Sequence, residues 1–153
     1  MGHFLSALAE IFTNESLYRN AMISAVVLLF AASGELVAEK AGTINISLEA
    51  MMLAGAFAAA VGMDSTDSVW LGLLMAAGGG LLVAAVQANM SHRLSADQFV
   101  VGLVLNVLVL GVVGFLVGSN EPESHVVSRW KVPGLAEIPL IGPALFDQPW
   151  VLY

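Results

Sequence analysis

The sequence predicts an all-α, polytopic membrane protein, a helix bundle with about four transmembrane helices plus the start of a fifth. Three observations lead to this class. Of the 153 residues, 58% are hydrophobic and 11% are charged, against about 25% charged in an ordinary soluble domain. The mean hydropathy is +0.86. The charged residues also leave long gaps, and two of these gaps are long enough to cross a membrane.

The two long gaps predict two membrane helices. Residues 68–92 and residues 98–120 contain no Asp, Glu, Lys or Arg. A helix that crosses a hydrocarbon core of about 30 Å needs about 20 residues at 1.5 Å per residue. A buried helix of a soluble bundle would still carry a polar stripe toward water. Both runs are therefore interpreted as transmembrane helices.

Two shorter uncharged runs predict two more spans. Residues 20–34 reach spanning length as residues 20–38, if Glu35 lies near the end of that helix. Residues 50–63 reach spanning length only if their helix, whole or broken, begins near Ala41. Glu49 then lies within the membrane. The second span is therefore the one expected to be broken.

The two ends of the chain differ from the spans. Residues 1–18 predict an interfacial amphipathic helix, because apolar residues recur there at three- and four-residue spacing. Residues 119–149 are polar and rich in proline, so little regular helix is expected. Placing Lys40 and Arg93 on the inside makes this long segment extracytoplasmic. A fifth helix is expected to begin after Pro149, and residues 1–153 form a single, incomplete transmembrane domain.

Charge and residue types exclude several function classes. With 5 Lys and Arg against 12 Asp and Glu, the net charge is −7, so no nucleic-acid partner is expected. There is no cysteine, and the three histidines lie far apart, so no metal site is expected. The triple glycine at residues 78–80 is not followed by the Lys and Ser or Thr of a phosphate loop. No catalytic constellation is present, and the chain is not expected to be an enzyme.

Polar residues between the first two spans are the strongest functional signal. Glu35, Glu39, Asn45 and Glu49 lie between two apolar runs. Charged groups within a membrane are costly and normally face a cavity or a partner. Glu39 and its neighbour Lys40 suit a solvated turn. We expect buried polar roles for Asn45 and Glu49, with a half-helix that begins near Asn45.

The fourth span carries a second polar position. Asn106 lies in its middle, one turn after Gly102, and Gly114 and Gly118 form a pair of small residues four apart. Small residues let membrane helices approach closely, and an amide can form a hydrogen bond across such an interface. We expect Gly102, Gly114 and Gly118 in helix packing. Asn106 suits either packing or, together with Asn45 and Glu49, the substrate pathway.

These segments resemble the membrane-spanning permease subunits of ATP-binding cassette (ABC) importers. Residues 34–42 read GELVAEKAG and residues 45–57 read NISLEAMMLAGAF. The branch for nucleosides and simple sugars, related to the ribose and branched-chain amino-acid permeases, has a similar string in which Arg stands at Lys40 and Gly at Ser47 and Ala50. Residues 96–106, ending in GLVLN, and residues 138–146 are also similar to that family.

The resemblance implies a transport function. It implies a multi-pass protein of a bacterial or archaeal plasma (inner) membrane that imports nucleosides or simple sugars by alternating access. It also implies a second permease subunit, cytoplasmic ATPase subunits, an extracytoplasmic solute-binding protein and contact with lipid. ATP would be bound by the partner ATPase, and this chain would carry no cofactor.

The chain differs from these permeases in its length. Such permeases are about twice as long and carry a basic loop that docks on the ATPase, so the chain is expected to be an N-terminal half. The alternative reading of the residues alone is a small oligomeric channel or an ion-coupled transporter that uses Glu35 or Glu49 as a proton or cation site. A third reading is an inert structural remnant.

Overall fold

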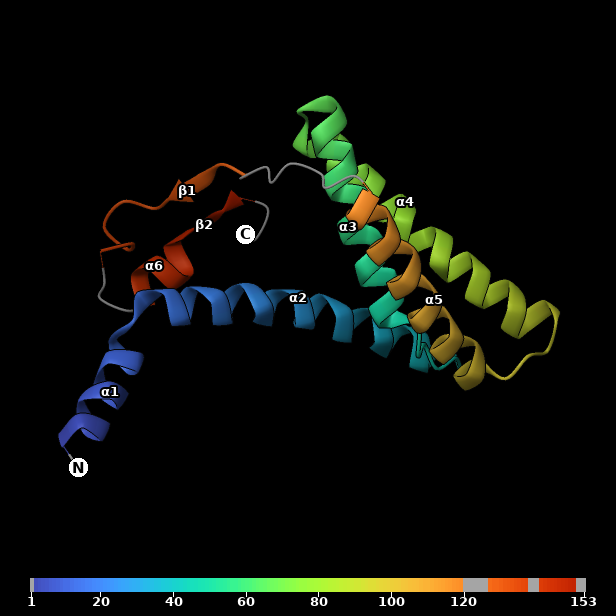
Figure 1. Cartoon of the computed structure of the whole chain (residues 1–153), viewed down its shortest axis with the longest axis horizontal. Helices are drawn as coiled ribbons and strands as arrows, with labels where there is room; N and C mark the ends of the chain where they lie inside the picture. Colours follow the sequence, from blue (N-terminus) through green and yellow to red (C-terminus); the bar gives the residue numbers. More distant parts are fainter. Residues whose placement is uncertain (1, 120–126, 138–140, 151–153) are drawn as a thin grey trace. The chain divides into compact units, whose positions relative to one another are not determined.

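The computed structural model describes residues 2–119, 127–137 and 141–150. The chain divides into two compact units, residues 1–32 with 127–153 and residues 33–126, and helix α2 contributes to both (Figure 1). In chain order the elements are α1 (Gly2–Thr13), α2 (Glu15–Lys40), α3 (Leu48–Thr66), α4 (Val69–Ala88), the π-helix η1 (Asn89–Arg93), α5 (Gln98–Ser119), β1 (Arg129–Lys131), α6 (Ile141–Phe146) and β2 (Asp147–Pro149).

The four predicted transmembrane helices are confirmed. In the described part of the chain, four helical stretches are long and apolar enough to cross a membrane: α2, α3, α4 together with η1, and α5. Large apolar side chains point outward from them, among them Phe30, Leu82 and Phe115. An outward apolar surface is what a helix requires where it meets lipid tails.

The N-terminal boundaries differ from the prediction for residues 1–18. Helix α1 ends at Thr13, and α2 already begins at Glu15. Asn14 separates them because its Oδ1 accepts hydrogen bonds from the Ser16 backbone N–H (3.0 Å) and the Ser16 hydroxyl (2.6 Å), which caps α2. Of the predicted amphipathic face, the side chains of Phe4, Leu5 and Leu8 lie outside the described part, and those of Ile11 and Phe12 are exposed.

Among the described residues after α5 are the short helix α6 and two short strands, which the sequence did not predict. Strands β1 and β2 pair antiparallel, with Trp130 opposite Gln148. An ion pair joins the Arg19 guanidinium in α2 to the Asp147 carboxylate at 3.1 Å. Residues 120–126, 138–140 and 151–153, including most of the predicted start of a fifth helix, lie outside the described residues.

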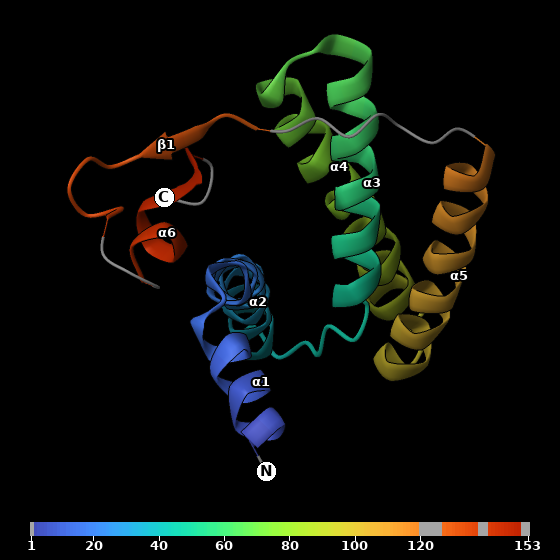
Figure 2. The same ribbon diagram turned by 60° about the vertical axis from the view of Figure 1, so that its left-hand side comes forward.

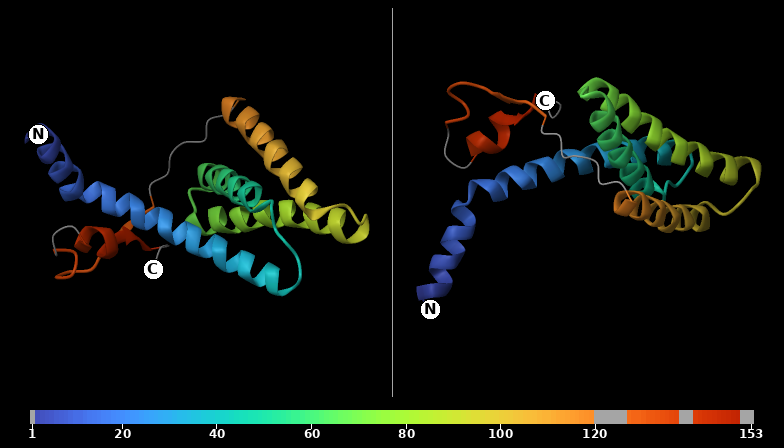
Figure 3. Two further views of the ribbon diagram at one scale, coloured as in Figure 1. Left: turned by 90° about the horizontal axis from the view of Figure 1, so that it is seen from below. Right: turned by 45° about the horizontal axis from the view of Figure 1, so that its top comes forward.

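In the unit of residues 33–126, α3 and α4 form a tightly packed hairpin (Figures 2 and 3). The turn between them uses Asp67 in the left-handed conformation (φ 50°), and the Ser68 hydroxyl accepts a hydrogen bond from the Leu71 N–H at 3.5 Å. Glycines let the two backbones approach. A Cβ on Gly55 would lie 3.1 Å from the Ala76 carbonyl oxygen, which is the contact that small residues permit between membrane helices.

Helix α5 completes this unit and builds a small core with α3 and α4. The buried apolar residues are Ala50 of α3, Val83 of α4, and Leu105 and Val109 of α5. Because the core is small, most of each helix surface is left facing outward. This core holds the first turn of α3 against the middle of α5, where Glu49 and Asn106 lie.

Two adjacent glycines of α4 test this packing. A Cβ on Gly79 would lie 2.8 Å from the Ala54 carbonyl oxygen, whereas a Cβ on Gly78 would meet nothing within 4 Å. We expect Gly79→Ala to lower the free energy of unfolding by about 1–3 kcal/mol because the helices must separate. Gly78→Ala should leave it unchanged or raise it by up to about 1 kcal/mol through helix propensity. Titration of the purified protein with denaturing detergent measures both, and equal effects would contradict the packing.

Candidate functional site

The site begins as a break between two membrane helices. Helix α2 ends at Lys40, α3 begins at Leu48, and residues 41–47 between them are not helical (Figure 2). Gly42 makes the turn, with φ at +82°, a conformation that favours glycine. The Thr43 N–H and hydroxyl both donate to the Ala38 carbonyl oxygen at 3.0 Å, which satisfies the end of α2.

Side chains from three helices satisfy the backbone of the break. The Glu35 carboxylate of α2 accepts from the Asn45 N–H at 3.1 Å, and the Gln98 side chain of α5 accepts from the Ile44 N–H at 2.9 Å. The Gln87 amide of α4 donates to the Ile44 carbonyl at 3.4 Å. Non-helical backbone at membrane depth is tolerated only where protein or water supplies such partners. These side chains therefore hold the break in one conformation.

Asn106 fixes the other end of the break. Its Nδ2 donates to the Ile46 carbonyl at 3.0 Å, and its Oδ1 accepts from the Ala50 N–H at 2.9 Å. The side chain thus joins the last residues of the break to the first turn of α3. At 1.5 Å per residue, Asn106 lies about 12 Å from the first residue of α5, well inside a helix long enough to span a membrane. Helix α3 therefore starts within the span of α5.

Gly102 makes room for this arrangement. A Cβ at Gly102 would lie 2.5 Å from the Ile46 Cβ and 3.0 Å from the Ile46 carbonyl carbon. Gly114 and Gly118, the other two positions predicted for helix packing, have no atom within 4 Å of such a Cβ in the described part of the chain. That another helix packs against Gly114 and Gly118 therefore stays a prediction, and such a helix would come from outside the described part of the chain.

Asn45 and Glu49 lie in different surroundings. Asn45 is half-buried; its Nδ2 donates to the Met51 sulfur at 3.4 Å, and its Oδ1 accepts from the Ser47 hydroxyl at 3.1 Å. Ser47 is 0% exposed and Ala50 is 1% exposed. The expectation that Glu49 is buried is wrong, because α3 turns Ala50 inward and leaves the Glu49 side chain exposed. In place of a half-helix that begins near Asn45, the structure has the continuous helix α3, which begins at Leu48.

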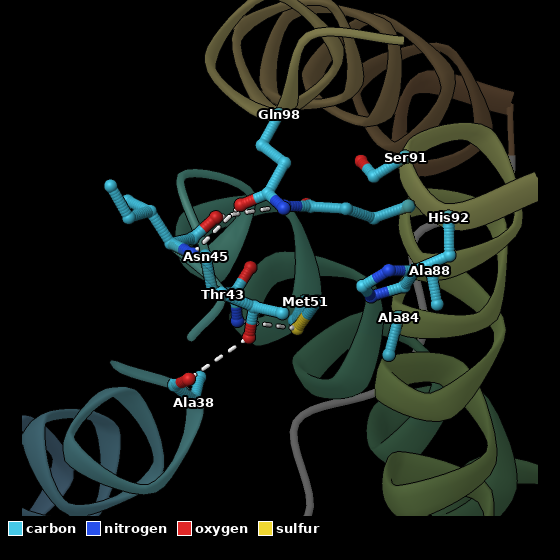
Figure 4. A pocket seen from close by; sticks show the side chains of 11 residues that line it. Ala38, Thr43, Asn45, Met51, Ala84, Ala88, Ser91, His92 and Gln98 are labelled. Atoms are coloured by element: carbon cyan, nitrogen blue, oxygen red, sulfur yellow. Dashed lines mark hydrogen bonds between the residues drawn. The ribbon is translucent and has the colours of Figure 1, made fainter. Parts of the chain in front are cut away.

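Two hollows flank the break. One, of about 160 Å³, lies between α3 and α5; Glu49 and Asn106 line it together with the apolar residues Ala50, Leu53, Val107 and Leu110. The other, which we call the crossover cavity, has about 140 Å³ and lies against the break itself (Figure 4). Its walls come from the end of α2, residues 43–45, α3, α4, η1 and Gln98. The three predicted pathway residues thus divide between the hollows, with Asn45 in the second.

Sequence reasoning missed three of the residues that hold the break. The sequence pattern predicts no role for Gln87 or Gln98 at the break. It places Glu35 at the end of a span or, in the alternative reading, at a proton or cation site. The usable signal was the break itself, since each backbone group that leaves a helix inside a membrane requires a polar partner. In the described ranges, no three His, Asp or Glu side chains gather closely enough to hold a metal ion.

Comparison with known proteins assigns the chain to a family. A family model described as the permease component of the branched-chain amino acid transport system matches residues 17–128, which include the break and all the side chains that hold it. The chain belongs to this permease family. The family resemblance drawn from the sequence is therefore confirmed, and this permease is a multi-pass membrane protein.

Curated relatives of the permease include three transporter subunits. A nucleoside ABC transporter permease protein of Lactococcus lactis is 32% identical over 89% of the chain and 46% of its own length. A putative glucose ABC transporter permease protein of Haloferax volcanii is 33% identical over 80% and 39%. A guanosine ABC transporter permease protein of Bacillus subtilis is 31% identical over 83% and 44%.

These relatives are longer than the permease described here, which spans somewhat under half of their length. No solved structure matches the chain closely enough to report. The relatives do not favour the alternative of a channel or ion-coupled transporter.

Proposed function

We propose that the chain is a permease component of an ABC importer for nucleosides or simple sugars. The observation that carries the proposal is the non-helical segment 41–47 between the membrane helices α2 and α3, whose backbone polar groups are paired with side chains of Glu35, Gln87, Gln98 and Asn106. Discontinuous helices form the solute sites of many transporters because they bring backbone polar groups into the membrane. The relatives' names supply the solute classes.

Other chains would supply the energy for transport and deliver the solute. Separate cytoplasmic ATPase subunits bind ATP, so this permease carries no cofactor and catalyses no reaction itself. A second permease subunit completes the pathway, and an extracytoplasmic solute-binding protein delivers the solute. The protein then belongs in the plasma (inner) membrane of a bacterium or archaeon.

The pathway residues follow from the two hollows. Alternating access requires an element that can adopt two arrangements, and the break offers one because residues 41–47 depend on side-chain hydrogen bonds rather than on a helical ladder. Asn45 borders the crossover cavity, while Glu49 and Asn106 border the hollow between α3 and α5. We propose that these three residues line the pathway or support it directly.

Uptake of radiolabelled nucleosides and sugars tests the proposal in the host organism. Deleting the gene should lower uptake of at least one of these solutes, and the wild-type gene should restore it. Glu49→Ala should restore less than about a tenth of the uptake, because it removes the carboxylate that borders the hollow between α3 and α5. Membrane abundance should stay normal, because the hydrogen bonds that hold the break do not involve this side chain.

The matched control is Glu39→Ala, which removes an exposed carboxylate from the last turn of α2. It should restore normal uptake. Normal uptake by Glu49→Ala would remove Glu49 from the pathway, and unchanged uptake after deletion of the gene would contradict the importer itself.

A further inference from the structure

The crossover cavity has the size of a single ring. Its volume of about 140 Å³ is close to the roughly 150 Å³ of an engineered protein cavity that binds one benzene molecule. A five- or six-membered sugar ring is of that size, whereas a nucleoside carries a base in addition. The cavity can therefore hold one ring of a solute and leave the remainder outside it.

Two polar atoms on one wall of the cavity have no partner. Gln87 is only 7% exposed, and its Oε1 is buried without a hydrogen bond in the described part of the chain, as is the Ser91 hydroxyl. Gln87 and Ser91 are four residues apart, so they share one face where α4 continues into the π-helix η1. Buried polar atoms are nearly always paired, and these two can pair with the hydroxyl groups of a molecule that occupies the cavity.

The remaining walls fit a neutral ring. Met51, Ala84 and Ala88 supply apolar surface, and the side chains of Asn45, Gln98 and Thr43 lie opposite η1 (Figure 4). Of the described residues that line the cavity, none is Asp, Glu, Lys or Arg, and His92 is the one titratable side chain (Figure 4). A sugar ring combines apolar C–H faces with hydroxyl edges, and it carries no charge.

We propose that the crossover cavity binds the sugar ring of the transported solute. One ring hydroxyl donates to Gln87 Oε1, a second exchanges a hydrogen bond with the Ser91 hydroxyl, and the C–H face packs on Ala84 and Ala88. This inference rests on the proposed function, since nucleosides and simple sugars share such a ring. It explains how one site serves both classes. A cluster of about four water molecules offers the same hydroxyl chemistry, and the experiment separates the two.

Single-cysteine labelling provides the test, because the natural chain has no cysteine. Ala84→Cys places a thiol in the cavity, and Leu82→Cys, on the same helix and 67% exposed, places one on the outer surface of the helix. A thiol reacts with a charged methanethiosulfonate reagent as the hydrated thiolate. In native membranes we expect labelling of Ala84→Cys, which water in the cavity can reach. We expect little labelling of Leu82→Cys, because the outer surface of the helix faces lipid and the reagent is charged.

Competition identifies the ligand. Ribose at twice its dissociation constant should slow the labelling of Ala84→Cys about threefold, since one third of the cavities are then empty. Guanosine should also slow it, and uracil, a base without a sugar, should not. Adding Ser91→Ala, which removes one of the two unpaired polar atoms and none of the hydrogen bonds that hold the break, should leave the thiol reactive and weaken protection by ribose.

Three outcomes would overturn the inference. Labelling that ribose does not slow means that the cavity holds water only. Equal protection by uracil means that the site does not select a sugar. Absence of labelling both at Ala84→Cys and at Ala88→Cys, a second cavity position, means that the cavity is dry. Uptake after gene deletion is a separate measurement of the proposed function. If deletion lowers uptake but one of these three outcomes is found, the importer function is retained and only this inference fails.

Discussion

Replacing Asn106 with leucine is expected to lower the free energy of unfolding by about 2–6 kcal/mol and to abolish solute uptake. The substitution removes both hydrogen bonds that join the break to α3, one from Asn106 to the Ile46 carbonyl and one from the Ala50 N–H. Each backbone group is then left without its partner, and a buried unpaired group costs about 1–3 kcal/mol. Ala50 is 1% exposed, so water cannot readily replace the lost acceptor.

A second substitution keeps only the acceptor. Asn106→Asp retains an acceptor for the Ala50 N–H, but its ionised carboxylate would face the Ile46 carbonyl oxygen inside the span, so its unfolding free energy should be at least as low as that of Asn106→Leu. Unfolding by denaturing detergent and uptake in the deletion host measure the two effects. An Asn106→Leu variant as stable and as active as the wild type would show that Asn106 does not hold the break.

Gly102→Val should be nearly as damaging, for the opposite reason. A Cβ at this position would lie 2.5 Å from the Ile46 Cβ, and the backbone of Ile46 is also within 3.0 Å. The extra atoms must push residues 41–47 away from α5, which would lengthen the hydrogen bond that Asn106 donates to the Ile46 carbonyl. Overpacking of this kind costs about 1–3 kcal/mol, and loss of the hydrogen bond adds to it.

The matched control for Gly102 lies on the same helix. Gly111→Val adds the same atoms where a Cβ would meet nothing within 4 Å, so the unfolding free energy should change by less than about 0.5 kcal/mol. Detergent titration of the two variants measures the difference. Equal losses would mean that helix propensity, and not contact with Ile46, explains the effect of Gly102→Val.

The spans were predictable from the sequence because lipid imposes a simple rule. A helix that crosses the hydrocarbon core excludes charge over about 20 residues, and the gaps in the charge pattern located all four helices. The ends were less predictable. Helix α2 begins at Glu15 and ends at Lys40, beyond the expected residues 20–38, because a helix continues past the hydrocarbon core until a capping residue such as Asn14 or a turn such as Gly42 ends it.

The interruption near Asn45 was predictable in part, but its partners were not. The second span, expected to begin near Ala41 and to be broken, is the continuous helix α3 from Leu48 to Thr66, and residues 41–47 form a non-helical connection before it. Which side chains satisfy that segment depends on the packing of α4 and α5 beside it. Gln87 and Gln98 lie far along the chain from Ile44, and only the folded unit brings them to it. The direction of Glu49 depends in the same way on which face of α3 meets α5.

Purification of the chain from native membranes tests the assignment as an importer permease most directly. An affinity-tagged chain, extracted in mild detergent, is analysed for bound proteins, and the same preparation is reconstituted into liposomes for flux measurements. We predict that an ATP-binding subunit co-purifies and that solute flux requires ATP and this subunit. Proton-dependent flux by the purified chain alone, with no ATPase bound, would contradict the assignment.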